Sequence, residues 1–361
     1  MDWWKRLKES RLARWGGAIL AVLYTVALFA EFVSPYDPYE SQLDGALLPP
    51  TAIYWRDASA QKQLIGPHVY PTTQGAIDIE TGARAVKVNV KAPARLKFFV
   101  SGFEYKVFGL IPCNWHLFGT ENSSSLKAYI NLLGTDEQAR DQFSRLVYGS
   151  RVSLFIGLLG IAISFPLGML VGGIAGYFGG WVDGILMRFV EVLMTIPDIY
   201  LLISLAAVLP PGLNSAQRFL LVTVITSFVR WAGLARVIRG QVLSIKEREF
   251  VQAAKVMGGQ PLYIILRHVL PQTATYVIIS ATLTIPSFII AEAILSLIGL
   301  GIQQPDPSWG NMLSLATNAS ILVLQPWLVS APAGLMILTV LAFNLLGDGL
   351  RDVLDPRGAE R

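Results

Sequence analysis

The chain has 361 residues, of which 53% are hydrophobic and only 15% are charged, and its mean hydropathy is +0.50. A typical soluble chain is roughly 45–50% apolar and about 25% charged. The composition therefore excludes a disordered or nucleic-acid-binding tail protein and indicates a membrane protein, and the net charge of +4 does not by itself point to nucleic acid. A single cysteine, Cys113, excludes an intrachain disulfide framework and a cysteine-based zinc site.

Six segments are long and apolar enough to cross a bilayer core of about 30 Å as helices. The first of them follows a basic N-terminus, as the apolar region of a signal peptide does, but it is too long and no small-residue cleavage site follows it. We therefore expect an uncleaved anchor helix there. The six predicted spans are Trp15–Ser34, Val152–Phe178, Ile185–Leu209, Phe219–Ile238, Pro271–Leu300 and Pro326–Leu346.

The distribution of Lys and Arg predicts the orientation, because basic residues gather in cytoplasmic loops. Five lie in the N-terminal tail (1–14), five in the loop 239–270 and three in the C-terminal tail (351–361). Both tails and this loop are therefore predicted to be cytoplasmic. The segment 35–150 is predicted to face outward, as an extracytoplasmic domain, and 151–350 to form a five-helix core.

The outward segment differs in composition from the rest. Residues 35–75 are rich in Pro, Tyr and Asp and favour an irregular stretch, whereas Ala85–Val90 and Leu96–Val107 are strand candidates. Asp136–Ser150 has apolar residues at helical spacing and predicts an amphipathic helix on the outer membrane surface, with an extended loop as the alternative. The predicted fold class is an all-α polytopic membrane protein with six transmembrane helices. Between the first two it carries an extracytoplasmic insert of mixed, partly β structure.

Common catalytic motifs are missing from the sequence. It contains no G-x-x-x-x-G-K-[ST], no H-E-x-x-H and no G-x-S-x-G, and its three histidines, His68, His116 and His268, lie in different segments. We expect no catalytic residue, no metal site and no cofactor in this chain.

Charged residues are few within the predicted spans, and Asp198, Arg230 and Glu292 are among them. Charged groups in lipid are costly and usually face a bundle interior or a water-filled path. They are candidates for a translocation path. The alternative is that they pair with one another or with backbone freed near Pro197 and Pro286.

Lys246–Met257 favours a short helix, since Phe250, Ala253, Ala254 and Met257 recur at i, i+3, i+4 and i+7. Gly258-Gly259 supplies a stop, and Pro261 begins a new segment. Small residues in the middle of this helix would let a partner approach closely. The pattern predicts a docking element; an interfacial helix lying on the headgroups is the alternative.

REFVQAAKVMGG followed by RHVLPQ resembles the E-A-A-x-x-x-G loop of permease subunits of binding-protein-dependent ABC importers. Leu132–Leu154 and Ala291–Leu313 resemble the oligopeptide/dipeptide/nickel branch of that family, and together the matches cover nearly all of 132–350. One departure is Gln252, where the family usually has Glu. The other is the enlarged outward segment, which could dock a binding protein or cap the permease.

The resemblance implies half of a translocation path for peptides or similar small solutes. The implied partners are a second homologous permease, two cytoplasmic ABC ATPases that hold ATP and magnesium, and an extracytoplasmic solute-binding protein, in the inner membrane of a bacterium or archaeon. A secondary transporter or channel with a regulatory ectodomain is the alternative. The implied ATPase-docking residues are Glu249, Phe250, Gln252, Ala253, Ala254, Met257 and Gly258. Candidate binding-protein contacts are Asp136, Arg140, Asp141 and Arg145.

Overall fold

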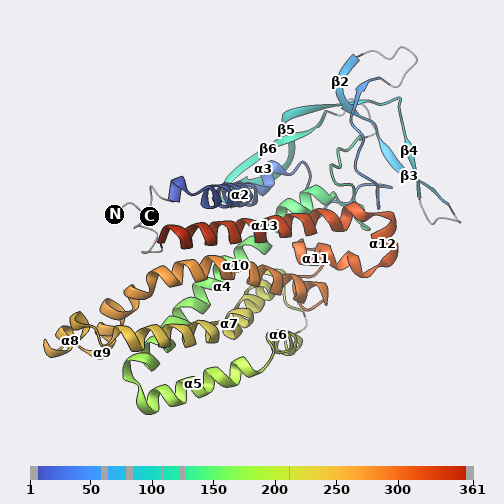
Figure 1. The fold of residues 1–361 in the computed structure, drawn as a ribbon. Helices are drawn as coiled ribbons and strands as arrows, with labels where there is room; N and C mark the ends of the chain where they lie inside the picture. The colour runs from blue at the N-terminus through green and yellow to red at the C-terminus, as the bar shows by residue number, and fades with distance from the viewer. Residues whose placement is uncertain are drawn as a thin grey trace. The chain divides into compact units, whose positions relative to one another are not determined.

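The computed structural model describes residues 7–57, 64–78, 84–107, 109–121, 127–210 and 212–354. The chain forms two compact units. Figure 1 labels the helices and strands along the chain. Unit 1 comprises Met1–Leu20, Phe155–Leu295 and Thr339–Arg361, and unit 2 comprises Ala21–Leu154 and Ser296–Leu338. The outermost residues of both tails, 1–6 and 355–361, lie outside the described residues, so the predicted tails are described only in part.

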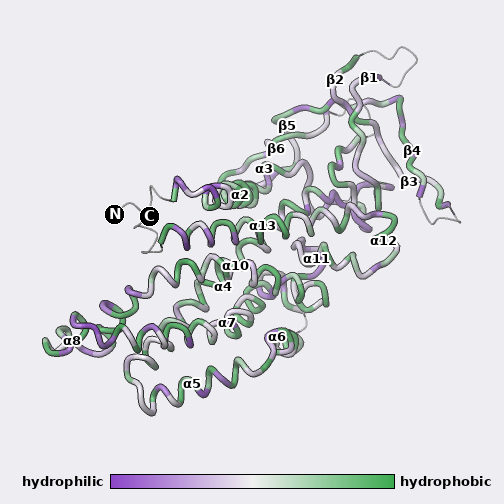
Figure 2. Tube along the Cα trace, in the orientation of Figure 1, coloured by the Kyte–Doolittle hydropathy of each residue, from purple (hydrophilic) through white to green (hydrophobic). Residues whose placement is uncertain are grey.

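Five helical segments in the described part of the chain are long and apolar enough to cross a membrane. Figure 2 shows hydrophobic residues predominating along several of them, such as α4, α10 and α13. They correspond to five of the six predicted spans. The segments are α2 (Arg11–Leu28), α4 (Gln142–Phe178), α7 (Ser215–Ile245), the run Pro261–Leu297 that ends in α10 (Ala274–Leu297), and α13 (Pro326–Leu354).

The third predicted span is not one helix. It consists of α5 (Gly180–Thr195) and α6 (Asp198–Ala207), and Ile196 between them is extended, with φ −85° and ψ 125°. Proline disfavours the helical conformation of the residue before it and cannot donate a backbone hydrogen bond. Pro197 therefore ends α5, and the predicted span Ile185–Leu209 consists of two helices rather than one.

Proline also shapes the start of the fifth span. α9 (Pro261–Ile264) continues through a π-helical turn (Ile265–Val269) and a 3-10 turn (Leu270–Thr273) into α10. Pro271 lies in the 3-10 turn, where its missing N–H breaks the regular ladder of backbone hydrogen bonds. The helical run therefore begins ten residues before the predicted start.

Within unit 1, glycines of α4 allow close packing against α7. A Cβ atom at Gly168 would lie 2.9 Å from the Trp231 carbonyl oxygen, and one at Gly176 would lie 2.8 Å from the Arg239 carbonyl oxygen. Real Cβ atoms do not approach backbone this closely, so each glycine removes a clash between two membrane helices.

Unit 2 contains the β structure. β1 (Tyr54–Arg56), β2 (Leu64–Val69), β5 (Ala94–Val107) and β6 (Ile111–Glu121) form an antiparallel sheet in the order β1-β2-β5-β6. β3 (Thr72–Ile77) pairs with β4 (Arg84–Val88) in a second sheet. β4 and β5 confirm the two predicted strands. The irregular stretch predicted over 35–75 was partly wrong, because β1, β2 and β3 lie in it and form through pairing across the chain rather than through a local pattern.

Of the amphipathic surface helix predicted over Asp136–Ser150, only the part from Gln142 is helical, and it belongs to α4. Residues 136–141 are turns and isolated bridges, which join Arg140 to Ser41 and Asp141 to Thr135. α4 begins at Gln142 and continues without a break to Phe178, and the Asp141 carboxylate accepts a hydrogen bond of 2.7 Å from the Ser144 N–H at its start. The amphipathic pattern is thus the first part of a membrane helix.

The remaining helices are short. They are α3 (Ala30–Val33), which follows α2 after an interruption at Phe29, α8 (Glu249–Val256), α11 (Trp309–Leu313), a 3-10 turn (Ser314–Thr317) and α12 (Ala319–Leu324).

Candidate functional site

The predicted docking helix is present in unit 1 as α8. Gly258 follows it with φ +84°, a conformation that glycine adopts without strain, and α9 begins at Pro261. The stop and the restart read from the sequence are therefore confirmed.

α8 has one buried face and one open face. Val251 is fully buried and Ala254 is 4% exposed, and both pack in the hydrophobic core of unit 1. Phe250 is 41% exposed and Met257 is 80% exposed, with Ala253 exposed between them on the same side. Ala254 is thus a core residue, whereas the face of Phe250, Ala253 and Met257 is an apolar surface available to a partner.

Gln252 has a role inside the chain. Its Nε2 donates to the Lys246 carbonyl oxygen at 3.0 Å and lies 3.4 Å from the Glu247 carboxylate. Lys246 follows the last residue of α7. A glutamate at position 252 has no donor and would face both the carbonyl and Glu247. The departure from the family pattern therefore lets this side chain tether α8 to the end of α7.

Two lysines connect α8 and the end of α7 to α4. Lys246 Nζ donates to the Gly176 carbonyl oxygen at 3.0 Å, near the end of α4, and Lys255 Nζ lies 5.1 Å from the centre of the Tyr177 ring. Both cations are held at the end of a membrane helix. α8 is therefore linked by side chains to α7 and α4, so that a force applied to it would reach both.

Two of the three translocation-path candidates line one pocket of unit 1. Asp198, at the start of α6, and Arg230, in α7, border a cavity of about 80 Å³ with Leu202 and Ile290. In the described structure no ion pair within 4.0 Å joins Asp198 to Arg230. Arg230 lies over the Phe288 ring, 5.6 Å from its centre, and its buried Nε has no hydrogen-bond partner within the described residues.

Glu292 does not join this pocket. It is fully buried in α10 and is not among the residues that line the cavity, although its neighbour Ala291 is. The pocket thus brings together Asp198 and Arg230, and Glu292 is not one of the residues that line it.

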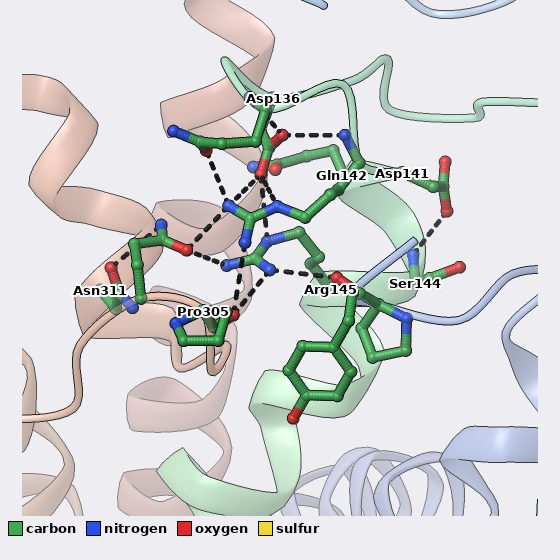
Figure 3. A network of polar contacts seen from close by, with 12 residues as sticks. Asp136, Asp141, Gln142, Ser144, Arg145, Pro305 and Asn311 are labelled. Atoms are coloured by element: carbon green, nitrogen blue, oxygen red, sulfur yellow. Dashed lines mark hydrogen bonds and ion pairs between the residues drawn. The ribbon is translucent and has the colours of Figure 1, made fainter. Parts of the chain in front are cut away.

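A buried polar network lies in unit 2 (Figure 3). Asp136 accepts from Arg140 Nε at 2.8 Å and lies 3.3 Å from Arg145 Nε. Both guanidinium groups also donate to the Gln304 side-chain oxygen, at 2.7 Å and 2.9 Å, and Arg145 donates to the Pro305 carbonyl oxygen at 3.0 Å. Two cations thus share one carboxylate and several neutral acceptors.

The network joins the two sequence stretches that resemble the same permease branch. Asp136, Arg140 and Arg145 belong to the first, and Gln304 and Pro305 to the second. The second stretch also supplies buried Trp309, which lies against the first: its backbone N–H donates to Ser153 Oγ at 3.1 Å and its ring N–H to the Leu146 carbonyl at 3.2 Å. The contribution of the second stretch was not predicted, although the resemblance already marked it.

The four candidate binding-protein contacts are not surface groups. Asp136 is 3%, Arg140 4% and Arg145 1% exposed, and Asp141 is fully buried. Their burial corrects the prediction of a contact surface. Asp136, Arg140 and Arg145 hold the start of α4 against Gln304 and Pro305, and Asp141 caps α4. Burial raises the pKa of Asp141 to about 7, from an ordinary value of 3.8.

No group of three or more His, Cys, Asp or Glu side chains that could hold a metal ion is found in the described part of the chain. The site therefore comprises an open helix face, a pocket with one carboxylate and one guanidinium, and a buried scaffold.

Two models of known protein families match parts of this sequence. A family model described as binding-protein-dependent transport system inner membrane component matches residues 166–359, and one described as the N-terminal TM domain of oligopeptide transport permease C matches residues 1–50.

One relative matches nearly the whole chain, and others match about two thirds of it. The dipeptide transport system permease protein DppC of Bacillus subtilis is 34% identical over 356 residues, which are 99% of this chain and 85% of that protein. The oligopeptide transport system permease protein OppC of Haemophilus influenzae is 40% identical over 227 residues, which are 63% of this chain and 70% of that protein. A chain of an inward-facing MetNI methionine ABC transporter structure is 19% identical with a TM-score of 0.43, covering 58% of this chain and 97% of that one.

Proposed function

This chain belongs to the family of binding-protein-dependent transport system inner membrane components, and we propose that it forms half of the translocation path of an ATP-driven peptide importer. It is a membrane permease and not an enzyme, since ATP hydrolysis in this family takes place on separate subunits. Membership in the family argues against the alternative of a secondary transporter or channel with a regulatory ectodomain.

The open face of α8 is the single observation that carries this proposal. Phe250 and Met257 are apolar and exposed at the end of a helix bundle, while the opposite face of α8 is fixed in the core. An exposed apolar stripe on a rigidly held helix fits a groove in a partner. The proposed occupant is one of two cytoplasmic ABC ATPases that bind ATP and magnesium, in an assembly with a second homologous permease and an external solute-binding protein.

The proposed topology has six crossings with both termini in the cytoplasm of a bacterium or archaeon, in the inner membrane. α5 and α6 together would make the third crossing, because helices of 16 and 10 residues extend about 24 Å and about 15 Å at 1.5 Å per residue. The break at Pro197 would then lie within the membrane, where an interrupted helix is tolerated if it borders a cavity. Asp198 follows this break and lines the pocket.

Peptides are the proposed cargo, in keeping with the two peptide permeases described above. A peptide carries an ammonium group at one end and a carboxylate at the other. Asp198 and Arg230 offer the opposite charges without forming an ion pair themselves. Their cavity of about 80 Å³ is well below the roughly 300–1,000 Å³ of a ligand pocket. We therefore assign these residues to the wall of the path rather than to a closed binding site.

The docking role is tested by placing a charge on the open face of α8. Ala253→Arg, in the full chain produced with its partner subunits, should abolish co-purification of the ATPase and transport of peptide into proteoliposomes. The matched control is Val323→Arg, a position 77% exposed on α12 of unit 2, which should keep both. Retention of the ATPase by Ala253→Arg at an unchanged melting temperature would contradict the docking assignment.

The cargo is tested separately. The external binding protein is isolated with the complex, and its bound ligand is identified by mass spectrometry. Peptides are expected; a nickel chelate or an oligosaccharide would overturn the peptide assignment while leaving the docking role intact.

A further inference from the structure

An apolar groove in unit 2 lies between the first membrane helix and the long hairpin of the outward segment. One wall consists of Val26 in α2, Phe29, and Val33 in α3, and the β5–β6 hairpin forms the other wall, with Val107 and Cys113. The groove has a volume of about 560 Å³. This is within the range of ligand sites in proteins, roughly 300–1,000 Å³.

The groove offers almost no hydrogen bond to a ligand. Its two hydroxyl groups already donate to backbone carbonyls: Thr25 Oγ1 to Ala21 at 2.7 Å, and Tyr105 Oη to Trp115 at 2.7 Å. A polar ligand would lose its hydrogen bonds to water without replacing them, which costs free energy. A hydrocarbon chain has none to lose, so the chemistry of the groove fits an acyl chain.

The hairpin is held firmly to the end of the helix. His116 is fully buried, with Nδ1 2.8 Å from the carbonyl oxygens of Glu31 and Ser34, and Nε2 3.1 Å from that of Phe103. A Cβ atom at Gly102 would lie 2.5 Å from the imidazole ring, so glycine provides the space for it. The two walls of the groove are therefore fixed relative to each other.

The position of the groove along α2 places it below the membrane surface. Arg151 forms an ion pair with Glu31 and donates to the Ala27 carbonyl oxygen at 2.7 Å. Both charges are partly exposed, and an ion pair that keeps contact with solvent belongs at the headgroup level. Thr25, at the deep end of the groove, precedes Glu31 by six residues, which is about 9 Å along a helix at 1.5 Å per residue. Interfacial elements bury their apolar faces to about 5–10 Å.

The surface of the hairpin agrees with this depth. Leu110 is 81% exposed and Ile111 is 64% exposed at its tip. Side chains alternate along β5, so that Tyr105 and Val107 face the groove whereas Glu104 and Lys106 are exposed on the opposite side. Long charged side chains reach back to the interface while their stems stay in apolar surroundings.

We propose that the β5–β6 hairpin lies in the outer leaflet of the membrane beside the first span, and that the groove holds an acyl chain of a phospholipid. The occupant follows from continuity: the groove wall of Val26 and Phe29 is part of the surface of a helix that crosses the bilayer. Part of the enlarged outward segment is thus a membrane-dipping element rather than a surface for the solute-binding protein.

The single cysteine of the chain provides the test, because Cys113 lines the groove. A nitroxide is attached to Cys113 in the full chain, reconstituted in phospholipid vesicles with cysteine-free partner subunits. Collisions with oxygen, which concentrates in hydrocarbon, are compared with collisions with a water-soluble nickel chelate. The matched control is Cys113→Ser/Lys87→Cys, because Lys87 is exposed on β4. The Cys113 label should collide severalfold more with oxygen than with the chelate, and the Lys87→Cys label should show the reverse.

Two results would overturn the proposal. Preferential collision of the Cys113 label with the nickel chelate would place the hairpin in water. Exclusion of both reagents would mean that protein, such as the second permease, covers the groove. A further variant, Leu110→Asp, changes an exposed tip side chain and leaves the core intact; it should raise the chelate collisions at Cys113, and an unchanged value would contradict insertion of the tip.

Discussion

Two arginines, one buried and one half-buried, show how differently the two units treat charge. Arg145 in unit 2 is 1% exposed, and its guanidinium group reaches Asp136, Gln304 and two backbone carbonyls. Arg230 in unit 1 lies over an aromatic ring, forms no ion pair with Asp198 in the described structure, and keeps a buried Nε without a hydrogen-bond partner.

The two arginines suit different roles. The surroundings of Arg145 suit a structural network, and those of Arg230 suit a surface that meets a ligand. A buried charge is tolerated when its hydrogen bonds are complete, and such a network fixes one geometry. A charge with unused donors is costly at rest, and that cost is offset when a passing ligand supplies the acceptor. The unit 2 network therefore holds the start of α4 in place, whereas Arg230 keeps a donor unused within the described residues, in line with its proposed place in the wall of the path. Each experiment below sets one side of this comparison against a matched control.

Removal of the scaffold arginine should have the largest effect. Arg145→Met leaves the buried Asp136 and the Pro305 carbonyl with fewer partners, and breaking a buried ion pair costs roughly 3–5 kcal/mol. The thermal melting of the purified protein in detergent is expected to shift downward strongly, with a low yield of folded chain. Lys97→Met is the control, since the Lys97–Glu121 pair is about half exposed and such pairs contribute roughly 0–1 kcal/mol. Similar melting temperatures for Arg145→Met and Lys97→Met would contradict the structural role of the buried network in unit 2.

Removal of the other arginine should affect transport instead of stability. Arg230→Met keeps the length of the side chain and removes an incompletely bonded charge, so the melting temperature should stay the same or rise. Peptide uptake into proteoliposomes should fall at least tenfold, which corresponds to about 1.4 kcal/mol. Arg188→Met is the control, because Arg188 is 80% exposed in its side chain, and it should transport normally. Unchanged uptake by Arg230→Met would exclude Arg230 from the path.

The sequence predicts the local features of this comparison well. Five of the apolar spans are confirmed, and α8 with its stop at Gly258 and its restart at Pro261 depends only on neighbouring residues. The sequence predicts freed backbone near Pro197, and the structure has a full break between α5 and α6 there.

Burial of the charges between 136 and 145 could not be predicted in the same way. A helix start with charged residues looks the same whether it lies on the surface or in a core, and the acceptors Gln304 and Pro305 are about 160 positions further along the chain. The same holds for β1, β2 and β3, which depend on pairing partners. The role of Gln252 is short-range, but it depends on a carbonyl that only the bend between α7 and α8 brings near.

A buried carboxylate in unit 2, Asp141, gives a further prediction, with a smaller expected effect on stability. Burial raises the pKa of Asp141 to about 7, against 3.8 in the unfolded chain. Between these values the folded state binds a proton that the unfolded state has lost, so its contribution to stability is present below about pH 4 and is lost as the pH rises through 7. The melting temperature should fall between pH 5 and pH 8. Asp141→Asn, which can still cap α4, should show a smaller fall; an equal slope would mean that Asp141 is ionised throughout.

The smallest effect is expected at the link between α8 and α7. Gln252→Glu restores the residue usual in the family but replaces the donor to the Lys246 carbonyl with a second carboxylate near Glu247. Loss of one hydrogen bond is worth about 1 kcal/mol, so the variant should melt a few degrees lower and couple ATP hydrolysis to transport less tightly.

The double variant Gln252→Glu/Glu247→Gln tests this cause directly. The amide introduced at position 247 can donate to the carboxylate introduced at position 252, which removes the repulsion between two carboxylates while the bond to Lys246 stays broken. Partial recovery of the coupling, measured as peptide transported per ATP hydrolysed, is therefore expected. If Gln252→Glu alone couples better than the native chain, the missing charge outweighs the tether, and the open face of α8 with its ATPase contacts, rather than its attachment to α7, governs this position.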